Sequence, residues 1–269
     1  MQSVARLTST DEDFGKDHGL IHEAIVTGRK VGAGHDFWSK IAHNEDLFRK
    51  VVTLVDCNGY YPCNDYYPSV SQKRTREIMG KNFFGVEEAI QYLGENPSKA
   101  QLSVLAEVPL TEEVLESRKD THILVAVFPM SILDIRGEVK DQSLFYQQDW
   151  YNKKAFAKTG GVTEWQLVRK SPVGNSMSKT WDEQQALLAE DEEIPPARVM
   201  VYTIIGHFLA TGERLFENTY VRCSDLDSDG RRVNVGDFAQ GGLFIVSSYG
   251  WSDSRGDSLG LASSLKFQN

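Results

Sequence analysis

Residues 230–267 read GRRVNVGDFAQGGLFIVSSYGWSDSRGDSLGLASSLKF, and this stretch decides the fold that we expect. Turn-forming residues dominate it, because the 41 residues from 224 to 264 include nine Ser, seven Gly and six Asp. Apolar residues nevertheless recur, and the pairs Val233/Val235 and Leu259/Leu261 have the alternation of half-buried strands. The stretch therefore predicts a loop-rich surface of short strands that displays side chains for binding a partner.

Three residue types are missing from this region. The chain contains 15 Lys, 19 Glu and 5 Met, so the 48 residues 218–265 would hold about seven of them in proportion to length, yet they hold none. Codons that end in C, with the first two positions free, cannot encode Lys, Glu, Met, Gln or Trp. A segment diversified through such codons would lack these types except at fixed positions, and Gln240 and Trp251 are the two exceptions. Glycine- and serine-rich loops that exclude long side chains are the alternative explanation.

Regular elements precede this stretch. Residues 122–128 (HILVAVF) and 164–169 (EWQLVR) are predicted strands. Thr180 and Glu183 match a capping box, which predicts a helix over residues 181–189.

A longer helix follows this capped one. Two prolines open it and a glycine closes it, and four apolar residues at helical spacing form its expected buried stripe. The prolines are Pro195 and Pro196, the glycine is Gly212, and the stripe is Val201, Ile204, Ile205 and Phe208.

The first half of the chain carries weaker signals. Residues 36–51 predict an amphipathic helix with Phe37, Ile41, Phe48 and Val51 on one stripe. A short helix is expected over residues 85–93, ended by Gly94. Thr111 is expected to cap another helix that runs to Ser117.

The order of these elements resembles the variable target proteins of diversity-generating retroelements, whose C-terminal domain has a C-type-lectin-type fold. The resemblance covers residues 163–267. It lies in the succession EWQLVRKSPV (164–173), SKTWDEQQALL (178–188), PPARVMVYTIIGHFLATGERLF (195–216), YVRCSD (220–225) and the final stretch quoted above. The same order resembles the formylglycine-generating-enzyme branch of that fold.

The resemblance implies an α+β fold in two parts. Residues 1–144 form an N-terminal α/β region of unknown role. Residues 145–269 form a C-type-lectin-like ligand-binding domain, in which the variable segment spans about residues 231–258. Loops held by a rigid scaffold tolerate substitution while the core does not, so such a domain can vary its binding face and keep its backbone.

The resemblance also implies which positions are displayed and which are framework. The expected ligand-binding positions are Asn234, Asp237, Ala239, Phe244, Ser247, Ser248, Tyr249, Ser252, Ser254 and Asp257. The expected framework is Val233, Val235, Phe238, Leu243, Trp251, Leu259 and Phe267. Exposed aromatic residues give a large contact area at low entropic cost, so Tyr249 and Phe244 are the expected contact hot spots.

The function expected from these features is recognition of a ligand, in particular a protein, with no covalent chemistry and no cofactor. Two alternatives stay open. An oxidase of the formylglycine-generating type needs a pair of cysteines late in the chain, where only Cys223 occurs. A structural attachment protein of a virus or phage would use residues 1–140 for oligomerisation.

Composition excludes other classes of function. A net charge of -9 argues against nucleic acid as the main ligand, because phosphate binding needs a basic surface. No apolar run approaches the length of a membrane span, and the polar, acidic first residues do not form a secretory signal. We therefore expect a cytoplasmic or virion-associated protein.

One acidic motif suggests a metal. Asp225, Asp227, Asp229 and Gly230 spell D-x-D-x-D-G, the opening of a calcium loop. An EF-hand is excluded because its twelfth position, where a bidentate Glu is needed, is Gly236. A looser calcium site and a solvated acidic turn remain as readings of the motif, and no metal ligand is assigned.

Overall fold

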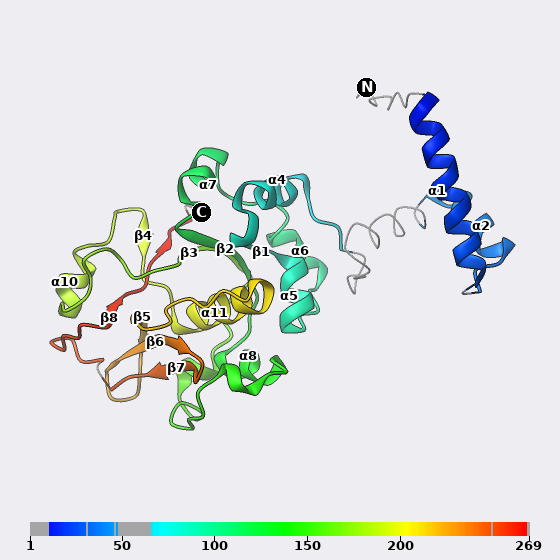
Figure 1. The fold of residues 1–269 in the computed structure, drawn as a ribbon. Helices are drawn as coiled ribbons and strands as arrows, with labels where there is room; N and C mark the ends of the chain where they lie inside the picture. The colour runs from blue at the N-terminus through cyan, green and yellow to red at the C-terminus, as the bar shows by residue number, and fades with distance from the viewer. Residues whose placement is uncertain (1–10, 31, 46, 48–65, 249, 268–269) are drawn as a thin grey trace. The chain divides into compact units, whose positions relative to one another are not determined.

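The computed structural model describes residues 11–30, 32–45, 47, 66–248 and 250–267, and its helices and strands form an α+β fold (Figure 1). The chain divides into two compact units, Met1–Tyr61 and Pro62–Asn269. None of the helices that the structure describes combines the length and the apolar character needed to cross a membrane.

The described part of the first unit is helical. It contains α1 (Asp11–Lys30) and α2 (His35–Ala42). The helix predicted over residues 36–51 is confirmed only in its first half, since α2 ends at Ala42; the expected stripe residues Phe48 and Val51 lie outside the described residues. Ile41 is buried, whereas Phe37 is 47% exposed.

A five-stranded mixed sheet forms one layer of the second unit. Its strand order is β1-β2-β3-β9-β4, with β1 parallel to β2 and the other neighbours antiparallel. The strands are β1 (Phe83–Phe84), β2 (His122–Val127), β3 (Glu164–Arg169), β9 (Ser264–Leu265) and β4 (Glu192–Glu193). The strands predicted at residues 122–128 and 164–169 are thereby confirmed as β2 and β3.

A four-stranded mixed sheet contains most of the C-terminal stretch. Its strand order is β7-β6-β5-β8, with β8 parallel to β5. The strands are β5 (Tyr220–Leu226), β6 (Arg232–Ala239), β7 (Gly242–Val246) and β8 (Leu259–Leu261). The strands predicted from the alternation at Val233/Val235 and Leu259/Leu261 are therefore confirmed as β6 and β8.

One long helix packs against both sheets. This helix, α11 (Ala197–Thr211), contacts strands of each sheet and the helices α5 (Val86–Leu93) and α8 (Ile132–Glu138) (Figure 1). The predicted ends are correct, because Pro196 is the N-cap and Gly212 is a left-handed C-cap with φ 75°. Every residue from Ala197 to His207 is buried, not just one stripe, as expected for a helix enclosed on all sides.

Shorter helices cover the remaining surface. They are α4 (Val70–Met79), α6 (Lys99–Val104), α7 (Glu112–Arg118), α9 (Ala155–Lys158) and α10 (Trp181–Gln185), with 3-10 turns at Gly80–Asn82 and Gln142–Leu144. Local caps set their ends as predicted: Gly94 is left-handed after α5, Thr111 accepts a hydrogen bond from Val114 N, and Thr180 and Glu183 form the capping box of α10. The helix predicted over residues 181–189 is shorter than expected.

The boundary predicted at residues 144/145 lies inside the unit Pro62–Asn269, and the two-part division at that point stays a prediction. Strand β2, from the first half, pairs along its whole length with β3, and the unit Pro62–Asn269 encloses both. A sheet that joins strands from both sides of residue 145 cannot be split there without losing its backbone hydrogen bonds.

The edge strand of the four-stranded sheet is covered by a passing segment. Phe145 forms an isolated bridge with Leu243, and Tyr146 N donates to Leu243 O at 3.1 Å. Trp150 Nε1 donates to Ile245 O at 2.8 Å. Two carbonyls of the edge strand β7 are thus occupied, which protects that edge from pairing with another chain.

Candidate ligand-binding surface

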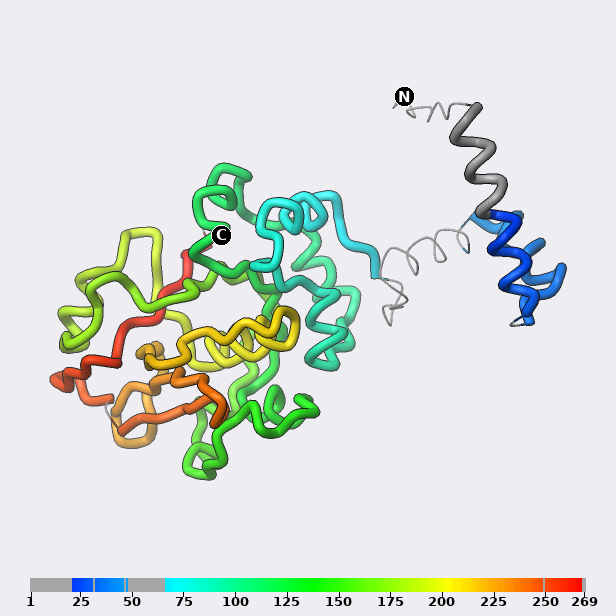
Figure 2. The backbone as a smooth tube through the Cα atoms, viewed as in Figure 1, coloured from blue at the N-terminus to red at the C-terminus, as the bar shows by residue number. Residues whose placement is uncertain are grey.

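The loop between β7 and β8, residues 247–258, is here called the display loop. Its main chain is fixed by hydrogen bonds to four of its carbonyl oxygens from distant backbone N–H groups. Arg232 N donates to Gly250 O at 2.8 Å, Trp181 N to Ser252 O at 2.9 Å, Ser178 N to Gly256 O at 2.8 Å and Tyr220 N to Ser258 O at 2.8 Å. The display loop therefore lies beside the segment that contains α10, as Figure 2 shows.

A buried guanidinium joins these two segments. Arg222 on β5 is 0% exposed, and its Nη1 donates to Lys179 O at 3.2 Å and to Gln184 Oε1 at 2.9 Å. Its Nη2 donates to Ser254 O at 2.7 Å and to Trp251 O at 3.4 Å. Burial lowers the pKa of Arg222 below its ordinary value. One side chain thus holds two further carbonyls of the display loop.

A glycine allows the display loop to approach β6 closely. A Cβ atom at Gly250 would lie 2.2 Å from Arg232 O and 2.6 Å from Arg232 N, distances that real Cβ atoms do not show. Because these neighbours are backbone atoms of a paired strand, they cannot move aside. Gly250 is therefore a fixed position of the loop.

Most described side chains of the display loop point into solvent. The exposed ones are Ser248, Trp251, Ser252, Asp253, Arg255, Asp257 and Ser258. The guanidinium of Arg231 lies 5.9 Å from the ring centroid of Trp251, and Arg255 pairs with Glu183 at 3.0 Å. The loop thus combines a main chain held by hydrogen bonds with side chains that are mostly exposed.

The predicted display positions have mixed outcomes. Ser248, Ser252 and Asp257 are exposed, and Asp237, Ala239, Phe244 and Ser254 are partly exposed. Tyr249 lies outside the described residues.

Asn234 and Ser247 were expected at the surface, and both are buried, with exposed fractions of 0% and 5%. The physical reason is that the display loop covers this face of the sheet, where Asn234 lies between Arg222 and Val246 on the neighbouring strands. Ser247 Oγ donates to Asp227 Oδ2 at 2.7 Å, so Ser247 anchors the loop. Among the residues that the structure describes, neither Oδ1 nor Nδ2 of Asn234 has a hydrogen-bond partner.

The framework prediction is correct for its strand residues and wrong for Trp251. Val233, Val235, Phe238, Leu243 and Leu259 are buried, and Phe267 is partly buried. Trp251 is 51% exposed, because Arg222 holds the loop here through the Trp251 carbonyl and leaves the indole outside. The indole is therefore available for contact with a partner.

An aromatic cluster lies on the same sheet. Phe244 stacks on Tyr146 with ring centroids 3.8 Å apart, and Tyr220 meets Phe244 edge-on at 6.4 Å. Tyr220 Oη donates to Asp237 Oδ2 at 3.0 Å, and Asp237 has φ 49° in an irregular part of β6 after Gly236. Tyr146 is 43% exposed. Sequence reasoning missed Tyr146 because its partner lies far along the chain.

The acidic turn is held by its own hydrogen bonds. Burial acts to raise the pKa of Asp227, but hydrogen bonds from Ser247 Oγ, from the backbone N–H groups of Arg231 and Asp229 and from the Arg231 side chain outweigh it and lower the pKa to about 2. Asp225 accepts a hydrogen bond from Ala197 N, at the start of α11. Asp227 is thus buried, not solvated. Within the described ranges, no group of three or more His, Cys, Asp or Glu residues is placed to hold a metal ion.

Cys223, the residue on which oxidase chemistry would depend, is buried on β5 with an exposed fraction of 0%. Burial raises the pKa of its thiol well above the ordinary value, and Asp225 adds to this effect. A thiol of this kind is a poor nucleophile, because the thiolate is the reactive form. Cys57 and Cys63 lie outside the described residues.

We compared the chain with protein-family models, with curated proteins and with solved structures. Nothing matches in any of the three comparisons.

Proposed function

We propose that the chain recognises a partner protein through the side chains of the display loop and the adjoining aromatic cluster, without covalent chemistry. The observation that carries this proposal is the way the loop is held. Six of its carbonyl oxygens accept hydrogen bonds from β5, β6 and the α10 segment, while seven of its side chains are exposed.

A loop with a fixed main chain and exposed side chains favours recognition for a physical reason. A loop that is ordered before binding loses little conformational entropy on binding, so more of the contact energy appears as affinity. The exposed side chains of the loop and of the aromatic cluster are of the types that recognition surfaces use. Trp251 and Tyr146 offer rigid aromatic area, while Ser248, Ser252 and Asp257 offer hydrogen bonds.

We further propose that the scaffold is C-type-lectin-like and that the display loop is diversified between copies of the gene. The pairing of β3 with β9 supports the scaffold, because it brings the first and last strands of residues 145–269 side by side. The absence of Lys, Glu and Met from residues 218–265 supports diversification. The hydrogen bonds to the loop carbonyls also support diversification. Backbone carbonyls are present whatever the side chains are, so these bonds do not depend on the side chains of the loop.

The gene tests this proposal directly. The 3′ end and its surroundings would be sequenced in several isolates. We expect a near-copy of the terminal segment beside a reverse-transcriptase gene, with differences at adenines in the codons of Ser248, Tyr249, Ser252 or Asp257. An invariant 3′ end without a second copy would refute diversification.

A binding assay separates recognition from diversification. Once a partner is found by selection from a displayed protein library, Trp251→Ala should weaken its binding at least about tenfold, as for an aromatic hot spot. A matched change at the exposed Val162 serves as control. Equal effects of both changes would place the binding surface elsewhere.

A further inference from the structure

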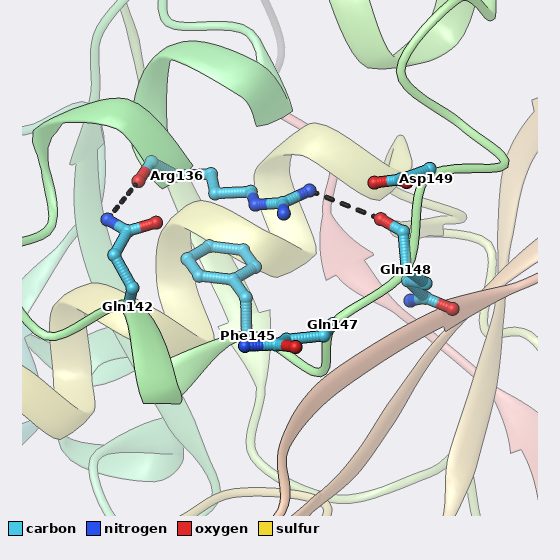
Figure 3. Close-up of a pocket in the computed structure, with 6 residues that line it drawn as sticks. All are labelled: Arg136, Gln142, Phe145, Gln147, Gln148 and Asp149. Atoms are coloured by element: carbon cyan, nitrogen blue, oxygen red, sulfur yellow. Dashed lines mark hydrogen bonds between the residues drawn. The ribbon is translucent and has the colours of Figure 1, made fainter.

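A polar pocket lies outside the display loop. It is lined by Arg136, Gln142, Phe145, Gln147, Gln148 and Asp149 and has a volume of about 370 Å³ (Figure 3). Arg136 comes from α8, and the other residues come from the segment that leads to the covered edge of β7. A cavity of this size accommodates a small metabolite.

The guanidinium of Arg136 is only partly used by the protein. Nη1 donates to Gln148 O at 3.3 Å, Tyr151 Oη at 3.3 Å and Asn152 Oδ1 at 3.4 Å, all long contacts that share one nitrogen. Nε and Nη2 have no acceptor, and Arg136 forms no ion pair, among the residues that the structure describes. The Nε and Nη2 edge is the side of a guanidinium that takes a carboxylate with two parallel hydrogen bonds.

An acidic group faces the same cavity. The side chain of Asp149 points toward the end of the Arg136 side chain, yet the two form no ion pair (Figure 3). Asp149 Oδ1 accepts a hydrogen bond from Asn152 Nδ2 at 3.3 Å, and within the described ranges no cation pairs with this carboxylate. The pocket therefore holds one positive and one negative group that form no direct ion pair with each other.

The rest of the lining is preorganised. Phe145 is 2% exposed, and its ring lies beneath the Arg136 side chain (Figure 3). Gln142 Nε2 donates to Arg136 O at 2.9 Å, which ties the helix end to the pocket. Gln148 Nε2 is buried and has no hydrogen-bond partner among the residues that the structure describes.

We propose that this pocket binds a free amino acid as its zwitterion. The carboxylate takes the Nε and Nη2 edge of Arg136, and the ammonium group takes Asp149. A ligand with only one of these charges leaves the other protein charge unpaired, so the pocket selects for ligands that carry both. All six lining residues precede residue 150, so this site lies outside the variable segment, although Tyr146 of the aromatic cluster lies between two of them in sequence.

A titration on the full-length, 15N-labelled protein tests the proposal. Glycine, β-alanine and γ-aminobutyrate place the two charges at increasing separations, while acetate and methylammonium each carry one charge. Chemical-shift changes would be followed at Arg136 Nε–H and at the Gln148 side-chain amide. We expect at least one amino acid to bind about tenfold more tightly than either single-charge compound and to shift both signals.

Two variants locate the binding. Asp149→Asn is isosteric at an exposed position and keeps the fold; it should weaken amino-acid binding and leave acetate unaffected. Arg136→Lys keeps the charge and removes the paired donors, and it should weaken both ligands. Arg74→Lys, at an arginine paired with Glu112 at 2.8 Å, is the matched control and should change neither. Equal binding of acetate and all amino acids, no effect of Asp149→Asn, or no binding at all would overturn the proposal.

Discussion

At the scale of single residues, the display loop depends on the buried cation Arg222. Moving a guanidinium out of water costs several kcal/mol, which hydrogen bonds must offset. The Arg222 acceptors described above are three carbonyls and the Gln184 amide oxygen, from two segments far apart in sequence. Because two acceptors belong to the display loop and two to the segment that contains α10, the same bonds that stabilise the cation also hold these two segments together.

Replacement of Arg222 by methionine should therefore loosen the display loop. Methionine fills a similar volume without donors, so the carbonyls of Trp251 and Ser254 would be left buried and unpaired. We expect the free energy of unfolding to fall by about 2–4 kcal/mol. Hydrogen exchange at the amides of residues 250–258 should accelerate more than exchange in β2.

Arg255→Met is the control for this change. Arg255 pairs with Glu183 in an exposed salt bridge, so its loss should cost less than about 1 kcal/mol. Equal destabilisation by the two variants, or unchanged exchange in the loop of Arg222→Met, would show that the guanidinium does not hold the loop.

For Asn234 we predict a substitution that stabilises the protein, in contrast to Arg222→Met. Both polar atoms of its amide are buried without partners in the described part of the chain, so the folded state carries their desolvation cost. Asn234→Leu has nearly the same shape and no polar atom, and it should raise the free energy of unfolding by about 1–2 kcal/mol in urea titrations. The same change at the exposed Asn218 should leave stability almost unaltered. A loss of stability at Asn234 would mean that its amide is hydrogen-bonded in solution.

At the scale of elements, local sequence patterns were sufficient to predict the ends of helices, because neighbouring residues set these ends. Gly94, Thr111 and Gly212 end or begin helices within one residue of the prediction, because a cap needs only its own turn. The alternation that predicts β6 is equally local.

Burial on the outer face of β5 and β6 could not be predicted in this way. Val221 and Cys223 point inward, so alternation places Arg222 on the face that usually meets solvent. That face is covered by the display loop, which starts more than twenty residues later. The errors at Asn234 and Ser247 have the same origin, since both depend on a contact that no local pattern encodes.

Acidic residues lie close together where α8 contacts the end of α5, and they predict a pH dependence of stability. Glu95 follows α5, and its burial, together with the charges of Glu138 and Asp134, raises its pKa from 4.5 to about 7. Because the pKa of the Glu95 carboxyl is higher in the folded than in the unfolded state, its contribution to stability is fully present below the unfolded-state pKa. That contribution is lost as the pH rises through the folded-state pKa. Stability should therefore decrease between about pH 4.5 and pH 7 because of Glu95.

Glu95→Gln should remove this dependence. The variant should be more stable than the parent at pH 8, by at most about 3 kcal/mol, and the difference should vanish near pH 4. Thermal unfolding across this pH range measures it. Glu107→Gln, at an exposed glutamate, is the control and should follow the parent at every pH. A difference that grows toward low pH would contradict the assigned direction.

At the scale of the whole molecule, one core supports both sheets. Helix α11 contacts each sheet, and β2 from the first half pairs with β3 from the second. This pairing joins segments on the two sides of the boundary predicted at residues 144/145. The display loop is therefore attached to a core that most of the chain builds, and the tolerance of change that we propose for the loop would depend on the entire unit.

Such tolerance is testable by changing several exposed positions together. The triple variant Ser248→Tyr, Ser252→Tyr, Asp257→Tyr alters only exposed side chains, and the loop carbonyls that accept hydrogen bonds stay in place. We expect its melting temperature to stay within about 3 °C of the parent, corresponding to about 1 kcal/mol for a unit of this size. The single variant Ser247→Tyr must instead place a large ring where a buried hydroxyl bonds Asp227, and it should cost more than the three exposed changes combined. If the triple variant unfolds and Ser247→Tyr does not, the side chains of the loop, and not its main chain, maintain its conformation, and the surface could not vary as we propose.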